Sequence, residues 1–288
     1  MQRLIASFLL FLATCASCQS KPFSPPTPEE RVQAIGDLSA LDSALWPAFL
    51  KLDDFSALPP PAENDWLAVH KERGQSFQNF LDEDMPRPSA EQAILYLQPI
   101  SELDRAEIDV PTLVEYCSAF FNTEARLLPD FELAPDEARR RINGFTGQEQ
   151  LHAADILEFL LQRRPDDAFA VIAFTMTDLY PSDSWNFVFG LADYRRGVGV
   201  FSFARYGDPQ AQLQRFQERA LKVMSHEIGH MYGIKHCVYF RCLMNGSNGL
   251  AETDAAPMSL CPVCLRKLHH SAQPDLLERY AKLAKLYE

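Results

Sequence analysis

Runs of apolar residues and segments of helical periodicity follow one another along most of the chain. Strands are predicted at residues 94–100 and 126–133, and the near-continuous apolar run at 168–177 is typical of a strand buried on both faces. Between them, helices are predicted from 111 to about 121 and over 149–164, where apolar residues recur at helical spacing. This order of elements predicts an α/β or α+β domain with a mixed, twisted sheet.

The second half of the chain continues the pattern. Two strands are predicted at 186–192 and 197–204 and form a hairpin, because a polar turn joins them. A long helix from about 210 to 230 and a closing helix at 276–287 follow. Near the start of the chain, residues 31–55 also have helical spacing.

Composition and charge describe an ordinary globular protein. Of 288 residues, 47% are hydrophobic and 23% are charged, which is enough apolar material for a sizeable core. The net charge is −12, and no run of lysine and arginine is present, so a role in binding nucleic acid is not expected.

The first residues are typical of an export signal. Residues 1–18 combine one arginine with a short apolar run and small residues, and they resemble the signal of a bacterial lipoprotein. Either Cys15 or Cys18 would carry the lipid; a plain secretory signal is the alternative. Residues 19–64 are predicted to be a tether and N-terminal extension, and 65–288 the globular domain. We expect an exported protein, anchored by lipid in a bacterial cell envelope, or else a secreted or periplasmic one.

The segment HEIGHMYGIKHC, which starts at residue 226, carries the candidate chemistry. On a helix, His226 and His230 share one face and suit two ligands of one zinc ion, while Glu227 reaches a water on that metal. Gly233 can end the helix, so that the chain turns and His236 returns as the third ligand. Three protein ligands leave one position for water, as in a catalytic zinc site.

Four cysteines lie at the end of this segment and shortly after it. Cys237 and Cys242 form a C-x4-C pair, and Cys261 and Cys264 form a C-x2-C pair. These spacings suit a tetrahedral zinc-thiolate knuckle. Disulfides are the alternative, because exported proteins meet oxidising conditions.

Several motifs together resemble the archaemetzincins, a branch of the metzincin zinc peptidases. They include the extended histidine motif with its cysteines, and DWLAVH, LHAADILEFL, TDLYPSDSWNFVFG and GVGVFSFARYG, which start at residues 65, 151, 177 and 197. The resemblance covers about residues 65–288. It implies a zincin-like fold with an active-site helix, a Met-turn at Met244, and a C-terminal zinc-knuckle subdomain. It also implies two zinc ions per chain, one catalytic and one structural.

The expected activity is hydrolysis of peptide bonds in peptides or proteins, through a zinc-bound water that Glu227 activates. Residues 187–192 are a candidate edge strand for the substrate, with Gly190 allowing close backbone approach, although an ordinary core strand fits the same pattern. The alternatives are a catalytically silent, zinc-stabilised module that binds peptides or partners, and a hydrolase of other bonds. We expect a monomer that contacts membrane only through a lipid anchor. The remaining histidines are expected to be surface or core residues: His70, His152, His269 and His270.

Overall fold

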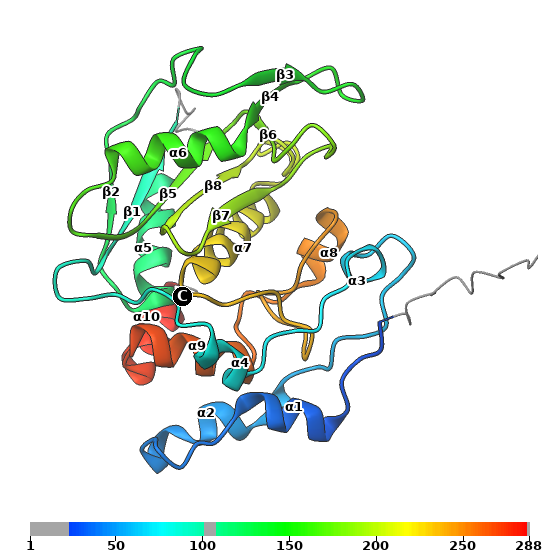
Figure 1. Ribbon diagram of the computed structural model, residues 1–288, viewed down its shortest axis with the longest axis vertical. Helices are drawn as coiled ribbons and strands as arrows, with labels where there is room; N and C mark the ends of the chain where they lie inside the picture. The colour runs from blue at the N-terminus through cyan, green and yellow to red at the C-terminus, as the bar shows by residue number, and fades with distance from the viewer. Residues whose placement is uncertain (1–22, 101–107, 287–288) are drawn as a thin grey trace, which may run out of the picture.

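A computed structural model describes residues 23–100 and 108–286 (Figure 1). Its centre is a five-stranded sheet with the order β2-β1-β5-β8-β7. Four strands are parallel, and β7 pairs antiparallel with β8 at the edge of the sheet. The predicted mixed α/β fold is therefore confirmed. The strands are β1 (Ile94–Pro99), β2 (Ala125–Leu127), β5 (Ala168–Thr175), β7 (Gly190–Asp193) and β8 (Val198–Ser202).

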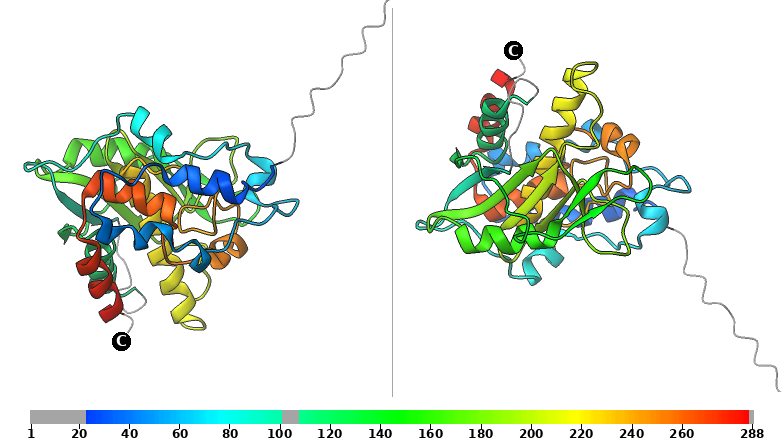
Figure 2. Two further views of the ribbon diagram at one scale, coloured as in Figure 1. Left: turned by 90° about the horizontal axis from the view of Figure 1, so that it is seen from below. Right: turned by 90° about the horizontal axis from the view of Figure 1, so that it is seen from above.

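Helices cover both faces of this sheet. All eight residues of β5 are buried, because its side chains alternate between two cores. Phe169, Ile172 and Phe174 point into the core shared with α5 (Val110–Phe121) and α7 (Leu213–Met231), whereas Val171 and Ala173 point to α6 (Ala153–Arg163). In the right-hand view of Figure 2, α6 lies on one side of the sheet and α5 and α7 lie on the other.

A second, three-stranded sheet was not predicted. It has the order β3-β4-β6 and consists of β3 (Arg140–Ile142), β4 (Glu149–His152) and β6 (Asp178–Tyr180). The helix expected at 149–164 is therefore wrong in its first turn, because residues 149–152 pair with β3 and β6 before α6 begins. Four residues are too few for periodicity to separate a strand from a first helical turn.

Other boundaries also differ from the prediction. The strand expected at 126–133 ends at Leu127, and Phe131 makes only an isolated bridge to Ile100. The hairpin strand expected at 186–192 begins at Gly190, and Val188 makes an isolated bridge to Leu179 instead. The expected strands at 168–177 and 197–204 and the long helix at 210–230 are present with shifts of a few residues.

The N-terminal extension is packed against the domain from residue 28 onward. The helical spacing expected over 31–55 corresponds to several short helices: Gly36, with a φ of +78°, ends the first, and Pro47 starts another. Ile35 and Phe49 are nevertheless buried, and α1 and α9 lie side by side in Figures 1 and 2. The helices are α1 (Pro28–Ile35), α2 (Pro47–Leu50), α3 (Trp66–Val69), α4 (Phe77–Asp82) and α9 (Pro262–Ala272).

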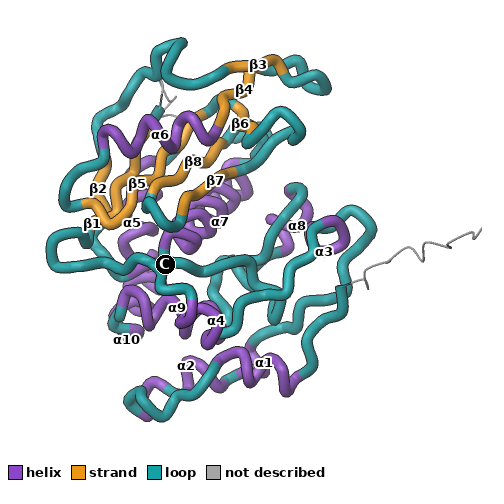
Figure 3. Tube along the Cα trace, viewed as in Figure 1, coloured by secondary structure: helices purple, strands orange, loops and turns teal. Residues whose placement is uncertain are grey.

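The lower half of the molecule contains much more loop than the sheet half (Figure 3). Besides α9 it holds α8 (Leu250–Ala255) and α10 (Leu276–Leu286), and the latter confirms the predicted closing helix. Across residues 23–100 and 108–286, no helix combines the length and the apolar character that a membrane span requires. The predicted signal at 1–18 lies outside the described residues.

Candidate metal centre and substrate cleft

Helix α7 brings two of the predicted ligands together. Its apolar residues, among them Phe216 and Met224, pack under the sheet, so the helix is held firmly along its length. His226 and His230 lie one turn apart, and their Nε2 atoms are 3.0 Å from each other. The helix therefore presents two imidazoles to one point in space.

The turn after α7 returns the third histidine to the same point. Gly233 has a φ of +82°, which a side chain at this position would oppose, and its N–H donates to the carbonyl of His230 at 2.8 Å. A Cβ there would also lie 2.7 Å from Cγ of Met85. His236 then lies with its ring 5.2 Å from that of His226 and 5.0 Å from that of His230. The expected role of Gly233 in ending the helix is thus seen in the structure.

The other ring nitrogen of each histidine has an acceptor. Nδ1 of His226 is 2.9 Å from the carbonyl oxygen of Leu243, and Nδ1 of His230 is 2.6 Å from that of Ile234. A carbonyl oxygen only accepts, so both Nδ1 atoms carry the proton and both Nε2 atoms present lone pairs. Two lone pairs at 3.0 Å repel each other unless a cation lies between them. The donor set therefore fits a metal ion.

His236 is held by a residue that the sequence analysis did not single out. Its Nδ1 lies 2.8 Å from Oε1 of Glu72, in the loop after α3. Burial alone would raise the pKa of Glu72, but the hydrogen bond with His236 lowers it below its ordinary value. Carboxylate partners of this kind orient metal-binding histidines and increase their basicity. Glu72 lies 164 positions before His236, and no local pattern connects the two.

Burial keeps the helical histidines neutral. It lowers the pKa of His226 to about 3 and that of His230 well below its ordinary value. A neutral imidazole is the form that binds a metal. Both helical rings are thus in the protonation state that zinc requires.

Glu227 is buried against the edge strand. It is only 7% exposed, and burial raises the pKa of its carboxyl to about 8. A Cβ on Gly190 would lie 2.5 Å from Oε1 of Glu227. The first residue of β7 must therefore be a glycine for the carboxyl group to occupy this place.

Met244 lies against Gly229 of α7, the residue before His230. It is fully buried, and a Cβ on Gly229 would lie 2.5 Å from its Sδ. The N–H of Cys237 donates to the carbonyl of Met244 at 2.7 Å, so the loop that carries Met244 is tied to the third predicted ligand. This is the position that the Met-turn interpretation requires.

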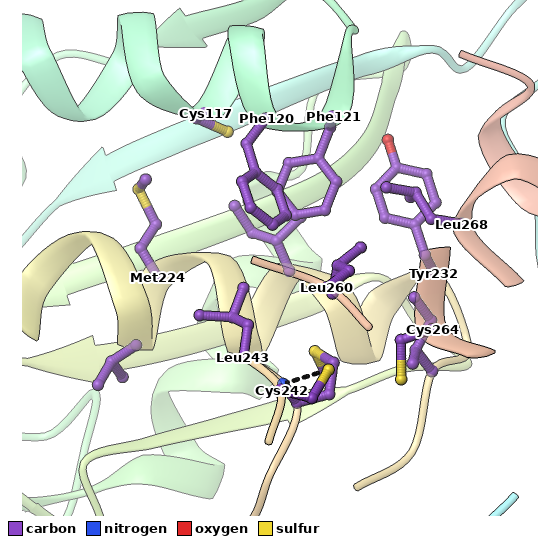
Figure 4. Close-up of a cluster of buried hydrophobic side chains, with 14 of the residues drawn as sticks. Cys117, Phe120, Phe121, Met224, Tyr232, Cys242, Leu243, Leu260, Cys264 and Leu268 are labelled. Atoms are coloured by element: carbon purple, nitrogen blue, oxygen red, sulfur yellow. Dashed lines mark hydrogen bonds between the residues drawn. The ribbon is translucent and has the colours of Figure 1, made fainter. Parts of the chain in front are cut away.

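The four predicted cysteines meet in one cluster. Their sulfur atoms all lie within 4.8 Å of one another, and all four are buried free thiols rather than disulfides. Sγ of Cys242 accepts N–H groups from Met244 and Cys261 at 3.5 and 3.3 Å, as sulfurs in zinc knuckles do. In Figure 4 the sulfurs of Cys242 and Cys264 point away from Phe120 and Phe121, toward a common side of the apolar core. The cluster fits a tetrahedral zinc site.

A cleft of about 890 Å³ opens over the histidines, between β7 above and the loops of the lower half. Three stacked aromatic rings, from the lower and the upper wall, connect the two walls of the cleft. His70 lies between Trp66 and Trp185, with ring centroids 3.8 and 5.5 Å away. His70 was expected to be a surface or core residue rather than a metal ligand; it lies outside the group of three histidines, stacked between two residues that line the cleft.

The loop that carries Trp185 is anchored by a buried ion pair. Asp178 accepts two hydrogen bonds from Arg205, at 2.8 and 2.7 Å, and one from Gln150 at 2.8 Å. The guanidinium also lies 3.7 Å from the centre of the Phe187 ring. The loop with Phe187, which forms the upper wall of the cleft, is therefore connected through Arg205 and Asp178 to the three-stranded sheet.

The mixed sheet has an edge strand that starts at a glycine. Three imidazoles from the long helix and the loop after it converge beside a buried glutamate, and this fold and site together define a zinc metallopeptidase.

Comparison with known proteins gives the particular family. The sequence model of Peptidase family M54 matches residues 138–270. Archaemetzincin-2 of Homo sapiens is 35% identical over 285 residues, covering 87% of this chain and 78% of the relative. Archaemetzincin-1 of Mus musculus is 34% identical over 267 residues, covering 80% and 53%.

Solved structures agree. An archaemetzincin from Methanopyrus kandleri superimposes with a TM-score of 0.54 at 26% identity, covering 65% of this chain and 98% of that one. An archaemetzincin from Archaeoglobus fulgidus gives a TM-score of 0.50 at 29% identity, covering 60% and 99%. The chain belongs to the archaemetzincin family of zinc metallopeptidases.

Proposed function

We propose that this enzyme cuts peptide bonds with one zinc ion held by His226, His230 and His236 and with Glu227 as the group that moves the proton. The observation that carries the proposal is the pair of Nε2 lone pairs at 3.0 Å, fixed by carbonyl acceptors behind both rings. Zinc in such a site acts as a Lewis acid that polarises the substrate carbonyl and acidifies a water molecule.

Glu227 moves the proton. Its carboxyl group is buried and poorly solvated, so it accepts a proton at Oε1 or Oε2 more readily than an exposed glutamate. It takes this proton from the attacking water and gives it to the nitrogen of the leaving amine. Gly190 keeps the carboxyl in place, because the edge strand lies directly against it.

The substrate binds along β7. Within residues 23–100 and 108–286 this strand pairs with β8 on one side only, so its other edge can add an extended peptide through backbone hydrogen bonds. Antiparallel pairing is somewhat more stable per residue than parallel pairing. The peptide therefore runs opposite to β7, with its cut bond beside Gly190.

The four cysteines hold a second, structural zinc ion. Their sulfurs are buried and close enough to share one cation, and Cys237 follows His236 directly in the chain. The knuckle would fix the position of the third histidine and of the loop with Met244. We thus propose two zinc ions per chain.

We also propose a location in the cell, on the pattern of residues 1–18 alone. The charge, apolar run and small residues of 1–18 support export followed by lipid attachment at Cys15 or Cys18. Mass spectrometry of the mature protein from its native membrane would test this. A lipid-modified N-terminal cysteine is the expected result. A mature protein that is shortened at its N-terminus but carries no lipid would refute the lipid anchor and support only export.

The test of the activity is direct. The zinc-loaded protein is incubated with a mixed peptide library, and new termini are read by mass spectrometry. We expect cleavage by the wild type and none by Glu227→Gln with equal zinc content, while Glu115→Gln, an exposed glutamate on α5, cleaves normally. A fully loaded wild type that produces no new termini would contradict peptide hydrolysis and favour a module that binds peptides without cutting them.

A further inference from the structure

One charged side chain of the cleft has no part in the chemistry above. Lys222 precedes His226 by four residues on α7, so the two lie on the same face of the helix, about 6 Å apart along its axis. Both line the same cavity. Lys222 is only 7% exposed, which is rare for a lysine.

The ammonium group of Lys222 has neutral partners. Its Nζ donates to the carbonyl oxygens of Thr253 and Asp254 at 3.2 and 3.1 Å, near the end of α8. The carboxylate of Asp254 is itself bound by Arg219. In the described part of the chain no carboxylate forms a hydrogen bond with Lys222, and the carboxylates of Glu218 and Asp254 act on its charge only from a greater distance. An ammonium has three donors, so one N–H and a positive charge remain for a ligand.

The surroundings of Lys222 in the cavity are largely apolar. Val223, Leu243, Phe189 and Ala256 line the same space. In a weakly polar pocket a charge interacts more strongly with an ion of opposite sign than it does in water, and it strongly disfavours an apolar or cationic group. A carboxylate is the group that satisfies such a pocket.

The direction of the strand tells which part of the substrate reaches Lys222. Strand β7 is antiparallel to β8, and α7 returns antiparallel to β8 as well, so β7 and α7 run in roughly the same direction (Figure 1). Lys222 therefore lies toward the start of β7. A peptide that pairs antiparallel to β7 has its carboxyl end on this side, beyond the bond beside Gly190.

The stacked rings lie toward the same end. Trp185 precedes β7 by five positions, and His70 and Trp66 join it from the lower wall. These rings restrict the space for a long chain after the cut bond. The group that meets Lys222 thus belongs to the first residues after that bond.

We infer that Lys222 selects substrates that carry a carboxylate immediately after the cut bond, either as an aspartate or glutamate side chain or as the carboxyl terminus of the peptide. The inference rests on the proposed peptidase function. In this role Lys222 determines specificity. The role is separate from the structural one that its hydrogen bonds to the end of α8 provide.

The experiment compares matched peptides. Two amidated peptides differ only in Glu or Gln after the cut bond, and two others end shortly after a neutral residue, as free acid or as amide. For wild type we expect kcat/KM to favour the carboxylate member of at least one pair by about 10- to 100-fold. The first pair reports side-chain recognition and the second reports the terminal carboxylate.

Variants separate recognition from structure. Lys222→Met keeps the stem without the charge and is expected to abolish the preference, with most of the change in KM, while neutral peptides are cut as before. Lys222→Arg retains part of the preference. Lys282→Met, which removes a half-exposed lysine paired with Glu278 on α10 and not part of the cleft lining, leaves the ratio unchanged. Equal losses for all peptides in Lys222→Met, together with a lower melting temperature, would reduce Lys222 to a cap of α8 and overturn the inference.

Binding gives a second readout that needs no turnover. Zinc-loaded Glu227→Gln protein is titrated calorimetrically with the dipeptide amides Glu-Gly and Gln-Gly. Tighter binding of Glu-Gly that Lys222→Met removes supports the inference even if no peptide is cut, in which case only the proposed hydrolysis fails. Cleavage without any carboxylate preference, and equal binding of the two dipeptides, would refute the role of Lys222 while leaving the peptidase intact.

Discussion

Gly190 and Glu227 are in direct contact: a methyl group on Gly190 would lie 2.5 Å from Oε1, 2.7 Å from Cδ and 2.7 Å from Cγ of Glu227. The edge strand that is proposed to bind the substrate and the group that is proposed to move its proton are thus adjoining parts of one site. Gly190 is not needed for a left-handed backbone, since its φ lies outside that region. It is needed for the space that it leaves.

Gly190→Ala tests this relationship. We expect the added methyl to displace the carboxyl of Glu227 and lower kcat/KM by about 100-fold, because displacements near 1 Å at a reacting group have effects of that size. Zinc content and melting temperature stay near the wild-type values. Gly249→Ala is the matched control, since no atom lies within 4 Å of a Cβ there. Normal activity in Gly190→Ala would show that the strand is free to move away from Glu227.

Glu72 is expected to set the affinity for the catalytic zinc. Its carboxylate holds Nδ1 of His236 at 2.8 Å, and removing such a partner lowers metal affinity by about 10- to 100-fold. Glu72→Ala and the milder Glu72→Gln are compared with wild type by chelator competition. Glu83→Gln is the control, because Glu83 pairs with Lys235 and touches none of the three histidines. If both Glu72 variants bind zinc as tightly as wild type, the hydrogen bond has no role in holding the metal.

The cysteine cluster predicts a second metal ion with a distinct spectrum. Cys264→Ser is expected to bind one zinc instead of two, to melt at a lower temperature, and to lose the thiolate charge-transfer bands of the cobalt-substituted protein. Cys117→Ser is the control: this buried thiol belongs to the apolar core and not to the cluster, so its loss affects stability without changing the metal count. Two metal ions in Cys264→Ser, or disulfides among the four cysteines of the wild type, would refute the site.

The residues of the metal centre could be predicted from the sequence more completely than the residues of the cleft around it. His226, His230 and Glu227 are placed by one helical turn, and Gly233 and His236 follow within six residues, so local geometry alone brings them together. Each cysteine pair was found for a similar reason, because C-x4-C and C-x2-C are short local spacings. These are contacts that short stretches of backbone determine.

The residues that were missed depend on contacts between distant segments. Glu72, Trp66 and Lys222 acquire their roles only because the loop around 65–75 and helix α8 fold against α7. The second sheet was missed for a related reason. Its strands have three or four residues each, and β4 continues directly into α6, so pairing with β3 and β6 decides its conformation and periodicity does not.

The ion pair of Asp178 and Arg205 leads to the last prediction. Asp178 is 2% exposed and receives three hydrogen bonds, so its removal leaves Arg205 without its carboxylate partner in a mostly buried place and Gln150 with only the carbonyl of Asn186 as acceptor. Breaking a buried pair in this way costs about 3–5 kcal/mol. We expect Asp178→Ala to lower the free energy of unfolding by about that amount. We also expect a higher KM, since Arg205 supports the loop of Phe187 and Trp185.

Urea unfolding of zinc-saturated protein measures the loss of stability. Glu158→Gln is the control, because Glu158 and Arg196 form an ion pair with side chains 58% and 44% exposed, and such surface pairs contribute at most about 1 kcal/mol. The difference in the free energy of unfolding between Asp178→Ala and Glu158→Gln therefore tests whether the buried pair stabilises the protein. If Asp178→Ala destabilises the protein no more than Glu158→Gln does, the pair is replaceable by water, and the upper wall of the cleft owes its position to the stacking of Trp185 on His70 instead.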